Sequence, residues 1–203
     1  MAGSDVIAVI VSDEVALDAD GISVATSVGN NAALVIGGAL ADGGSVTNAS
    51  GRQVTILSAG NDSSKSFTIV GTDVNGDTLT EALTGANAGT ATSSGYFKTI
   101  ASITAVGNPA GNVSAGINAN AADVIFAGRT RLKGFSFVSG GTAGKANIRN
   151  GSVTGTEVVQ FRSIGTDDSS EDPFIPDEGL LFKDGCFVTF VVPQFDLMMF
   201  YHA

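Results

Sequence analysis

The sequence predicts an all-β chain made of two small β-sandwich or jelly-roll-like modules with an N-terminal arm. Short strand-like runs recur at a spacing of roughly ten residues, which is typical of sandwiches and jelly rolls. Glycine is frequent, with 27 among 203 residues, and turn-forming dipeptides separate the runs. Helix signals are few, and charged residues make up only 15% of the chain, against about 25% in ordinary globular domains.

The N-terminal part contains four strand-like runs separated by turn residues. These runs are 53–58, 66–71, 78–84 and 96–103. Residues 73–77 lie between the second and third runs and include Asn75-Gly76. Asn-Gly readily takes the positive φ of a type I′ turn, so we predict a hairpin here. Glu81 shares a face of the third run with Leu79 and Leu83, which an edge strand tolerates.

The aromatic residues divide the chain into two parts with different core chemistry. Of twelve phenylalanines, ten fall between Phe126 and Phe200. We place the boundary near 118–123, because this small polar stretch is typical of a linker. The predicted organisation is an N-terminal arm at 1–25, a β-sandwich at 26–125 and a second β-sandwich or jelly roll at 126–203.

The expected arm carries the one weak helix signal in the chain. Ser12 is a possible cap for a short helix at 12–17. Asp18, Asp20 and Gly21 follow directly and would end it. We therefore expect an arm that extends from the body or pairs with a neighbouring chain.

The C-terminal part shows the same style with larger side chains. Phe135 and Phe137, for example, alternate with polar residues. The runs 186–192 and 197–201 are apolar on both faces, which is typical of a central strand or a subunit contact. The candidates for the core or for a subunit seam are Phe187, Phe190, Met198, Met199, Phe200 and Tyr201.

The charge balance excludes some classes of partner. The formal net charge is −10, and such a surface repels the phosphates of nucleic acids. Most of that charge belongs to residues 1–128, so the C-terminal part is able to approach a partner that the N-terminal part repels. The start of the chain lacks the pattern of a signal peptide, and no apolar run is long enough to span a bilayer. We expect no nucleic acid, no membrane and no export.

No motif in the sequence points to a catalytic, cofactor or metal site. Cys186 is the only cysteine, so we expect a small buried apolar residue without an intrachain disulfide. Residues 140–145 resemble a phosphate loop, but Ser139 and Ala146 break the pattern, and a hairpin loop is favoured. Asp73, Asn75, Asp77 and Glu81 lack the spacing of a calcium loop, which favours a solvated hairpin.

Two further polar features remain open. Acidic residues crowd the segment 167–178, which is able to bind a hard cation but is favoured as an exposed acidic loop. His202, the only histidine, is the penultimate residue and a poor candidate for a catalytic relay.

Several strand and turn motifs together point to a known kind of protein. The motifs are Val-Thr-Ile-Leu-Ser-Ala-Gly-Asn-Asp at 54–62, the run at 66–81 that contains Val-Asn-Gly-Asp, and the segments 84–90, 96–103 and 111–116. This pattern resembles a β module that recurs in virion structural proteins of tailed bacteriophages. The stretch from Leu132-Lys133-Gly134-Phe135 to Phe200-Tyr201 is similar to a second such module. The resemblance covers most of residues 40–203.

The resemblance implies a non-enzymatic virion protein, with a capsid decoration or cement protein favoured. Such a protein would bridge neighbouring major capsid subunits on the virion surface, with a homotrimer or similar closed ring as the favoured oligomer. It would be made in the cytoplasm of the host bacterium. One alternative is a tail or head–tail connector protein built from the same modules.

A carbohydrate- or receptor-binding module is a further alternative. The absence of tryptophan counts against it, as does the presence of only Tyr96 and Tyr201 as tyrosines, because sugars stack on exposed aromatic rings. A hydrolytic enzyme is the least favoured interpretation.

Overall fold

The chain is all-β, as the sequence predicts. The computed structural model describes residues 6–12, 16–139, 143–164, 170–171, 174–191 and 195–202. The regular secondary structure of these residues consists of strands, with no helix. The described residues therefore contain no helix that could cross a membrane. The chain divides into two compact units: Ala16–Ala119, called here the 16–119 unit, and Met1–Val15 with Asn120–Ala203, called here the 120–203 unit.

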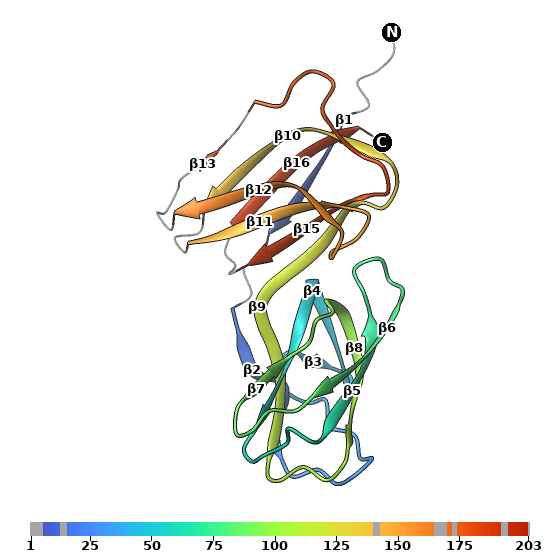
Figure 1. The fold of residues 1–203 in the computed structure, drawn as a ribbon, viewed down its shortest axis with the longest axis vertical. Coiled ribbons are helices and arrows are strands. Elements are labelled where there is room, and N and C mark those ends of the chain that lie inside the picture. The colour runs from blue at the N-terminus through green and yellow to red at the C-terminus, as the bar shows by residue number, and fades with distance from the viewer. Residues whose placement is uncertain are drawn as a thin grey trace. The chain divides into compact units, whose positions relative to one another are not determined.

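The 16–119 unit is built on four antiparallel strands in the order β4-β8-β5-β6 (Figure 1). The short strands β3 and β7 also pair with β4, and β2 pairs with the first half of β9. The bounds are β2 Asp18–Thr26, β3 Ala41–Asp42, β4 Ser45–Ser58, β5 Ser66–Thr72, β6 Thr78–Thr84, β7 Thr90–Thr92, β8 Phe97–Val106 and β9 Val113–Phe126.

The predicted hairpin is present between β5 and β6, although its turn differs from a two-residue type I′ turn. Thr72 pairs with Thr78, so residues 73–77 form the loop. Gly76 has a φ of 87°, and Asn75 is not in the left-handed region. The Asp73 carboxylate accepts hydrogen bonds from the backbone N–H groups of Asn75 and Asp77, at 2.8 and 3.0 Å. A side chain therefore organises this turn.

Glu81 has a structural partner that its strand pattern did not indicate. β6 lies at the end of the strand order, which confirms the edge position expected for this run. The two carboxylate oxygens of Glu81 accept hydrogen bonds from the backbone N–H groups of Ser94 and Gly95, each at 2.8 Å. The charge on the edge strand thus fixes a neighbouring turn through charge-assisted hydrogen bonds.

Arg52 is a buried cation in the 16–119 unit, with a side chain 2% exposed. Its Nη1 donates to the carbonyl oxygen of Ala119 at 3.1 Å. Burial lowers the pKa of this guanidinium to about 10, because a low-dielectric environment disfavours the charged form. The hydrogen bond ties β4 to the end of this unit.

The 120–203 unit is a sandwich of two antiparallel sheets. One sheet has the order β1-β16-β10, with β13 and β14 paired to β10, and the other has β12-β11-β15 followed by the second half of β9 (Figure 1). The bounds are β1 Val6–Ser12, β10 Thr130–Ser139, β11 Ala143–Asn150, β12 Thr156–Ile164, β13 Ser170–Glu171, β14 Leu180–Phe182, β15 Cys186–Val191 and β16 Phe195–His202.

A β-bulge in β10 sets which of its residues reach the core. Leu132 is buried, and strict alternation would turn Gly134 and Ser136 inward after it. The register against β16 shifts between Leu132 and Gly134, which inserts one extra residue. Phe135 and Phe137 therefore face the core, at 5% and 1% exposure.

The expected N-terminal arm at 1–25 is instead divided between the two units. β1 pairs with β16 from Val6↔His202 to Ser12↔Asp196, and β2 belongs to the 16–119 unit. The short helix expected at 12–17 is absent from its described residues, because Ser12 ends β1 and Ala16 and Leu17 lie outside any helix. The apolar run at the start of the chain, β1, pairs with β16 at the other end of the sequence.

The linker expected near 118–123 is also a strand. β9 runs without a break from Val113 to Phe126, and the unit boundary falls at Ala119 and Asn120. Small polar residues suggested a flexible connection, but Ala121 and Ala122 are fully buried and pair with Phe190 and Thr189 of β15. The expected modules at 26–125 and 126–203 therefore differ in their limits from the observed units.

The hairpin loop favoured for 140–145 is not supported by its flanking strands. β10 and β11 lie in different sheets, and β11 pairs with β12 and β15. The connection therefore leads from one sheet to the other, and residues 140–142 lie outside the described part of the chain.

Replacement of Gly71 tests the close approach of β5 to β8. A Cβ at this position would lie 1.9 Å from the carbonyl oxygen of Thr99. We expect Gly71→Ala to lower the free energy of unfolding by about 1–3 kcal/mol or more, because the backbone of a central strand must move. Gly29→Ala is the control, since a Cβ at Gly29 meets nothing within 4 Å. Equal denaturant midpoints for both variants would contradict this packing.

Phe190 tests the core of the 120–203 unit. Its side chain is fully buried among the residues of both sheets. We expect Phe190→Ala to cost about 3–5 kcal/mol of stability. Phe174→Ala removes the same atoms from a position that is 86% exposed and should leave the denaturant midpoint nearly unchanged. A midpoint of Phe190→Ala that equals that of Phe174→Ala would exclude a core role.

Candidate functional site

The apolar C-terminal residues separate into a buried set and an outward-facing set. Phe187, Phe190, Met199 and Tyr201 are buried, at no more than 8% exposure. Phe190, Met199 and Tyr201 belong to the core of the 120–203 unit, which is one of the two roles that the sequence predicts for them. Phe187 is buried but alternates with the core residues Cys186 and Val188 along β15. Met198 and Phe200 alternate with Leu197, Met199 and Tyr201 along β16 and are only partly buried. These two side chains lie on the outer face of the sheet.

β1 extends this outer face with further apolar side chains. Ala8 pairs with Phe200, and Ile10 pairs with Met198. Paired residues of antiparallel strands point to the same face, and Ile10 is 63% exposed. We call the set Val6, Ala8, Ile10, Met198 and Phe200 the β1 surface.

The free edge of β1 adds main-chain groups to this surface. β1 is the terminal strand of its sheet and, among the strands that the structure describes, pairs only with β16. Its sequence, Val-Ile-Ala-Val-Ile-Val-Ser, contains no lysine, no proline and no charge. Natural edge strands normally carry such residues to prevent pairing with another chain. An uncharged edge with exposed Ile7 and Ile10 is suited to pairing with another chain.

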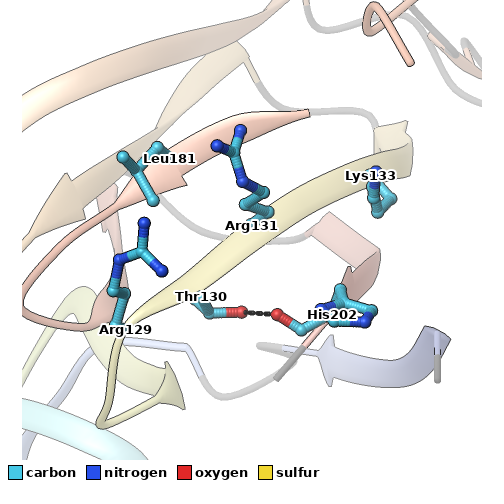
Figure 2. Close-up of a pocket in the computed structure, with 6 residues that line it drawn as sticks. All are labelled: Arg129, Thr130, Arg131, Lys133, Leu181 and His202. Carbon is cyan, nitrogen blue, oxygen red and sulfur yellow. Dashed lines mark hydrogen bonds between the residues drawn. The ribbon is translucent and has the colours of Figure 1, made fainter. Parts of the chain in front are cut away.

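A pocket of different chemistry lies at the start of β10 (Figure 2). It has a volume of about 330 Å³. The Thr130 hydroxyl in its wall donates to the backbone carbonyl of His202 at 2.6 Å, which joins β10 to β16. The lining residues are Arg129, Thr130, Arg131, Lys133, Leu181 and His202.

Two of the three basic side chains of this pocket are held by the loop before β14. Arg131 Nη1 donates to the carbonyl oxygen of Glu178 at 2.9 Å, and Lys133 Nζ donates to that of Asp177 at 2.6 Å. The acidic segment 167–178 was expected to be a cation site or an exposed loop. Of its carboxylates, that of Glu178 is 91% exposed and lies 4.0 Å from Arg131, while Asp167, Asp168 and Asp172 lie outside the described residues.

The basic pocket was not identified from the sequence. A usable signal exists, because Arg129, Arg131 and Lys133 recur at every second position, and in an extended segment such residues tend to share a face. Arg129 directly precedes β10, and Arg131 and Lys133 lie in it. The net charge of −10 does not show this cluster, because the chain has twice as many acidic as basic residues. The histidine that contributes to the wall, His202, also looked unimportant at the end of the chain.

Cys186 is fully buried in the core of the 120–203 unit, as expected from its apolar surroundings in the sequence. Burial raises the pKa of its thiol to about 12, because the thiolate loses its hydration. The thiol therefore stays protonated at neutral pH. Among the described residues, no three His, Cys, Asp or Glu side chains are grouped in a way that would hold a metal ion.

Comparison of the chain with protein-family models, with curated proteins and with solved structures gives no match.

Thiol reactivity tests the environment of Cys186. Only the thiolate attacks a disulfide reagent, so we expect no reaction of the native protein with 5,5′-dithiobis(2-nitrobenzoate) at pH 8. The unfolded protein should release one equivalent of thionitrobenzoate. Rapid stoichiometric release from the native protein would show that Cys186 is accessible.

Proposed function

We propose that this chain is a non-enzymatic structural protein of a tailed-bacteriophage virion and that it acts as a capsid decoration protein. The β-module resemblance of residues 40–203 is the basis of this role, and the β1 surface is the structural observation that supports it. An uncharged edge strand next to exposed apolar side chains is a feature expected of an assembly subunit. The partner is a neighbouring protein of the shell, in the first place the major capsid protein.

The β1 surface is able to bind such a partner in two ways at once. An extended segment of the partner adds to the free edge of β1 through main-chain hydrogen bonds, which supply affinity. Side chains of the partner cover Ile10, Met198 and Phe200 and remove apolar area from water. A stable interface buries about 800 Å² on each partner, so contacts beyond β1 complete it. A homotrimer provides these contacts three times over and strengthens attachment by multivalency.

Substitution of Ile10 tests this role. Ile10 is 63% exposed, so Ile10→Lys should fold normally. In the assembled state the lysine would be desolvated without a partner, and we expect about tenfold or greater loss of affinity for purified capsids in a sedimentation assay. Val35→Lys is the matched control, because Val35 is 75% exposed and lies in the other unit. Equal binding by both variants would exclude the β1 surface from attachment.

Deletion of the N-terminal residues is a poorer test of this role than a point substitution. Such a deletion would remove β1, including Val11, which is 5% exposed and belongs to the core. Loss of binding would then be confounded with loss of folding. The point substitution on the outer face avoids this problem.

The number of copies in the virion distinguishes the two places that the resemblance allows. Decoration of the shell requires many copies spread over its surface, whereas a tail or connector protein is present in a few copies at one vertex. Quantitative mass spectrometry of purified virions measures this ratio. A low copy number would overturn the decoration role in favour of the tail or connector.

A further inference from the structure

We propose that the pocket at the start of β10 is a binding site for a small molecule that carries a phosphate group. Such a site is independent of the proposed virion role. The charge, the shape and the hydrogen bonding of the six residues that line the pocket all point to this ligand (Figure 2).

Positive charge is concentrated around this pocket. The chain has ten lysine and arginine residues against twenty aspartate and glutamate residues. Three of those ten, Arg129, Arg131 and Lys133, line this single pocket. In a chain with a net charge of −10, clustering of cations around one concavity creates a local positive potential. Such a potential attracts a compact anion.

Within the part of the chain that the structure describes, main-chain carbonyl groups position two of the three cations of the pocket without neutralising them. Arg131 and Lys133 donate to the carbonyl oxygens of Glu178 and Asp177, which hold the side chains in place without cancelling their charge. The carboxylate of Glu178 approaches Arg131 only to 4.0 Å and is 91% exposed, so this pair is weak. Arg129 makes no hydrogen bond or ion pair to any residue within the described ranges and is exposed.

Three adjacent strands build the wall of the pocket. Arg131 pairs with His202 of β16 on one side and with Leu181 of β14 on the other. The Thr130 hydroxyl fixes β10 to β16 through the carbonyl of His202. Two arginine forks can bind a phosphate through several N–H groups, and Leu181 offers an apolar contact for a carbon skeleton.

The size of the pocket and the net charge favour a small ligand over a nucleic acid. The pocket volume of about 330 Å³ lies at the lower end of the range of about 300–1,000 Å³ for small-molecule sites. A nucleic acid presents many phosphates along its length and would meet the repulsion of a chain with a net charge of −10. A phosphomonoester carries a single phosphate group, so its negative charge lies beside the cations of the pocket and away from the acidic remainder of the chain.

The test is isothermal titration calorimetry with inorganic phosphate and with phenyl phosphate at constant ionic strength. We expect one saturable site per chain for phenyl phosphate, with tighter binding than inorganic phosphate because the phenyl ring contacts Leu181. If inorganic phosphate binds as tightly as phenyl phosphate, the organic group contributes nothing to binding. The ligand would then be the free phosphate ion, and the proposal of an organic phosphate would be overturned. Absence of saturable binding for both probes would overturn the site itself.

Variants separate the pocket from a general effect of charge. Arg129→Gln removes an exposed cation that has no hydrogen-bond or ion-pair partner among the described residues. We expect about a tenfold or greater increase in the dissociation constant. Lys145→Gln removes the same charge from β11, in the other sheet, and should change the dissociation constant by less than about twofold. Equal weakening by both variants would show a non-specific charge effect and overturn the site.

Two more measurements distinguish loss of binding from loss of folding, and a phosphate pocket from a nucleic-acid surface. Thermal melting of Arg129→Gln should match that of the unsubstituted protein, which shows that the variant is folded. A fluorescence anisotropy titration with a short duplex DNA should show no binding at the same ionic strength. Saturable binding of DNA that Arg129→Gln abolishes would identify the pocket as part of a nucleic-acid surface instead.

Discussion

The antiparallel register of β16 against β1 and β10 is the constraint on which both surface features of the 120–203 unit depend. This register turns Leu197, Met199 and Tyr201 into the core and leaves Met198 and Phe200 outside. A shift by one residue would exchange the two sets. The exposed apolar surface and the position of His202 in the basic pocket therefore have one physical cause, which is the burial of three large side chains.

The β-bulge in β10 adapts the neighbouring strand to the same register. Without the extra residue between Leu132 and Gly134, Phe135 and Phe137 would face solvent. The bulge also falls beside Lys133, at the point where the basic side chains meet the loop before β14. The same irregularity thus turns Phe135 and Phe137 into the core and falls at Lys133, which lines the pocket. Bulges often redirect side chains in this way at functional positions.

Much of the architecture follows from local patterns, and the errors have a common origin. The hairpin of β5 and β6, the edge position of β6 and the burial of Cys186 all agree with the structure. The boundary expected near 118–123 agrees with the division of the chain at Ala119 and Asn120. The separate arm and the linker character of 118–123 were wrong, because both stretches pair with strands far away in the sequence. The basic pocket was missed for a similar reason, since its wall joins residues 129–133 to Leu181 and His202.

The sequence by itself determined the all-β class, because alternation and turn chemistry act over a few residues. It also determined the separate composition of the two halves, in which nearly all phenylalanines belong to the C-terminal part. Only the tertiary structure decided that β1 is an edge strand of the C-terminal sandwich and that Met198 and Phe200 face outward. Strand order and register depend on long-range backbone pairing and on the packing of two sheets, and neither is encoded in any short segment.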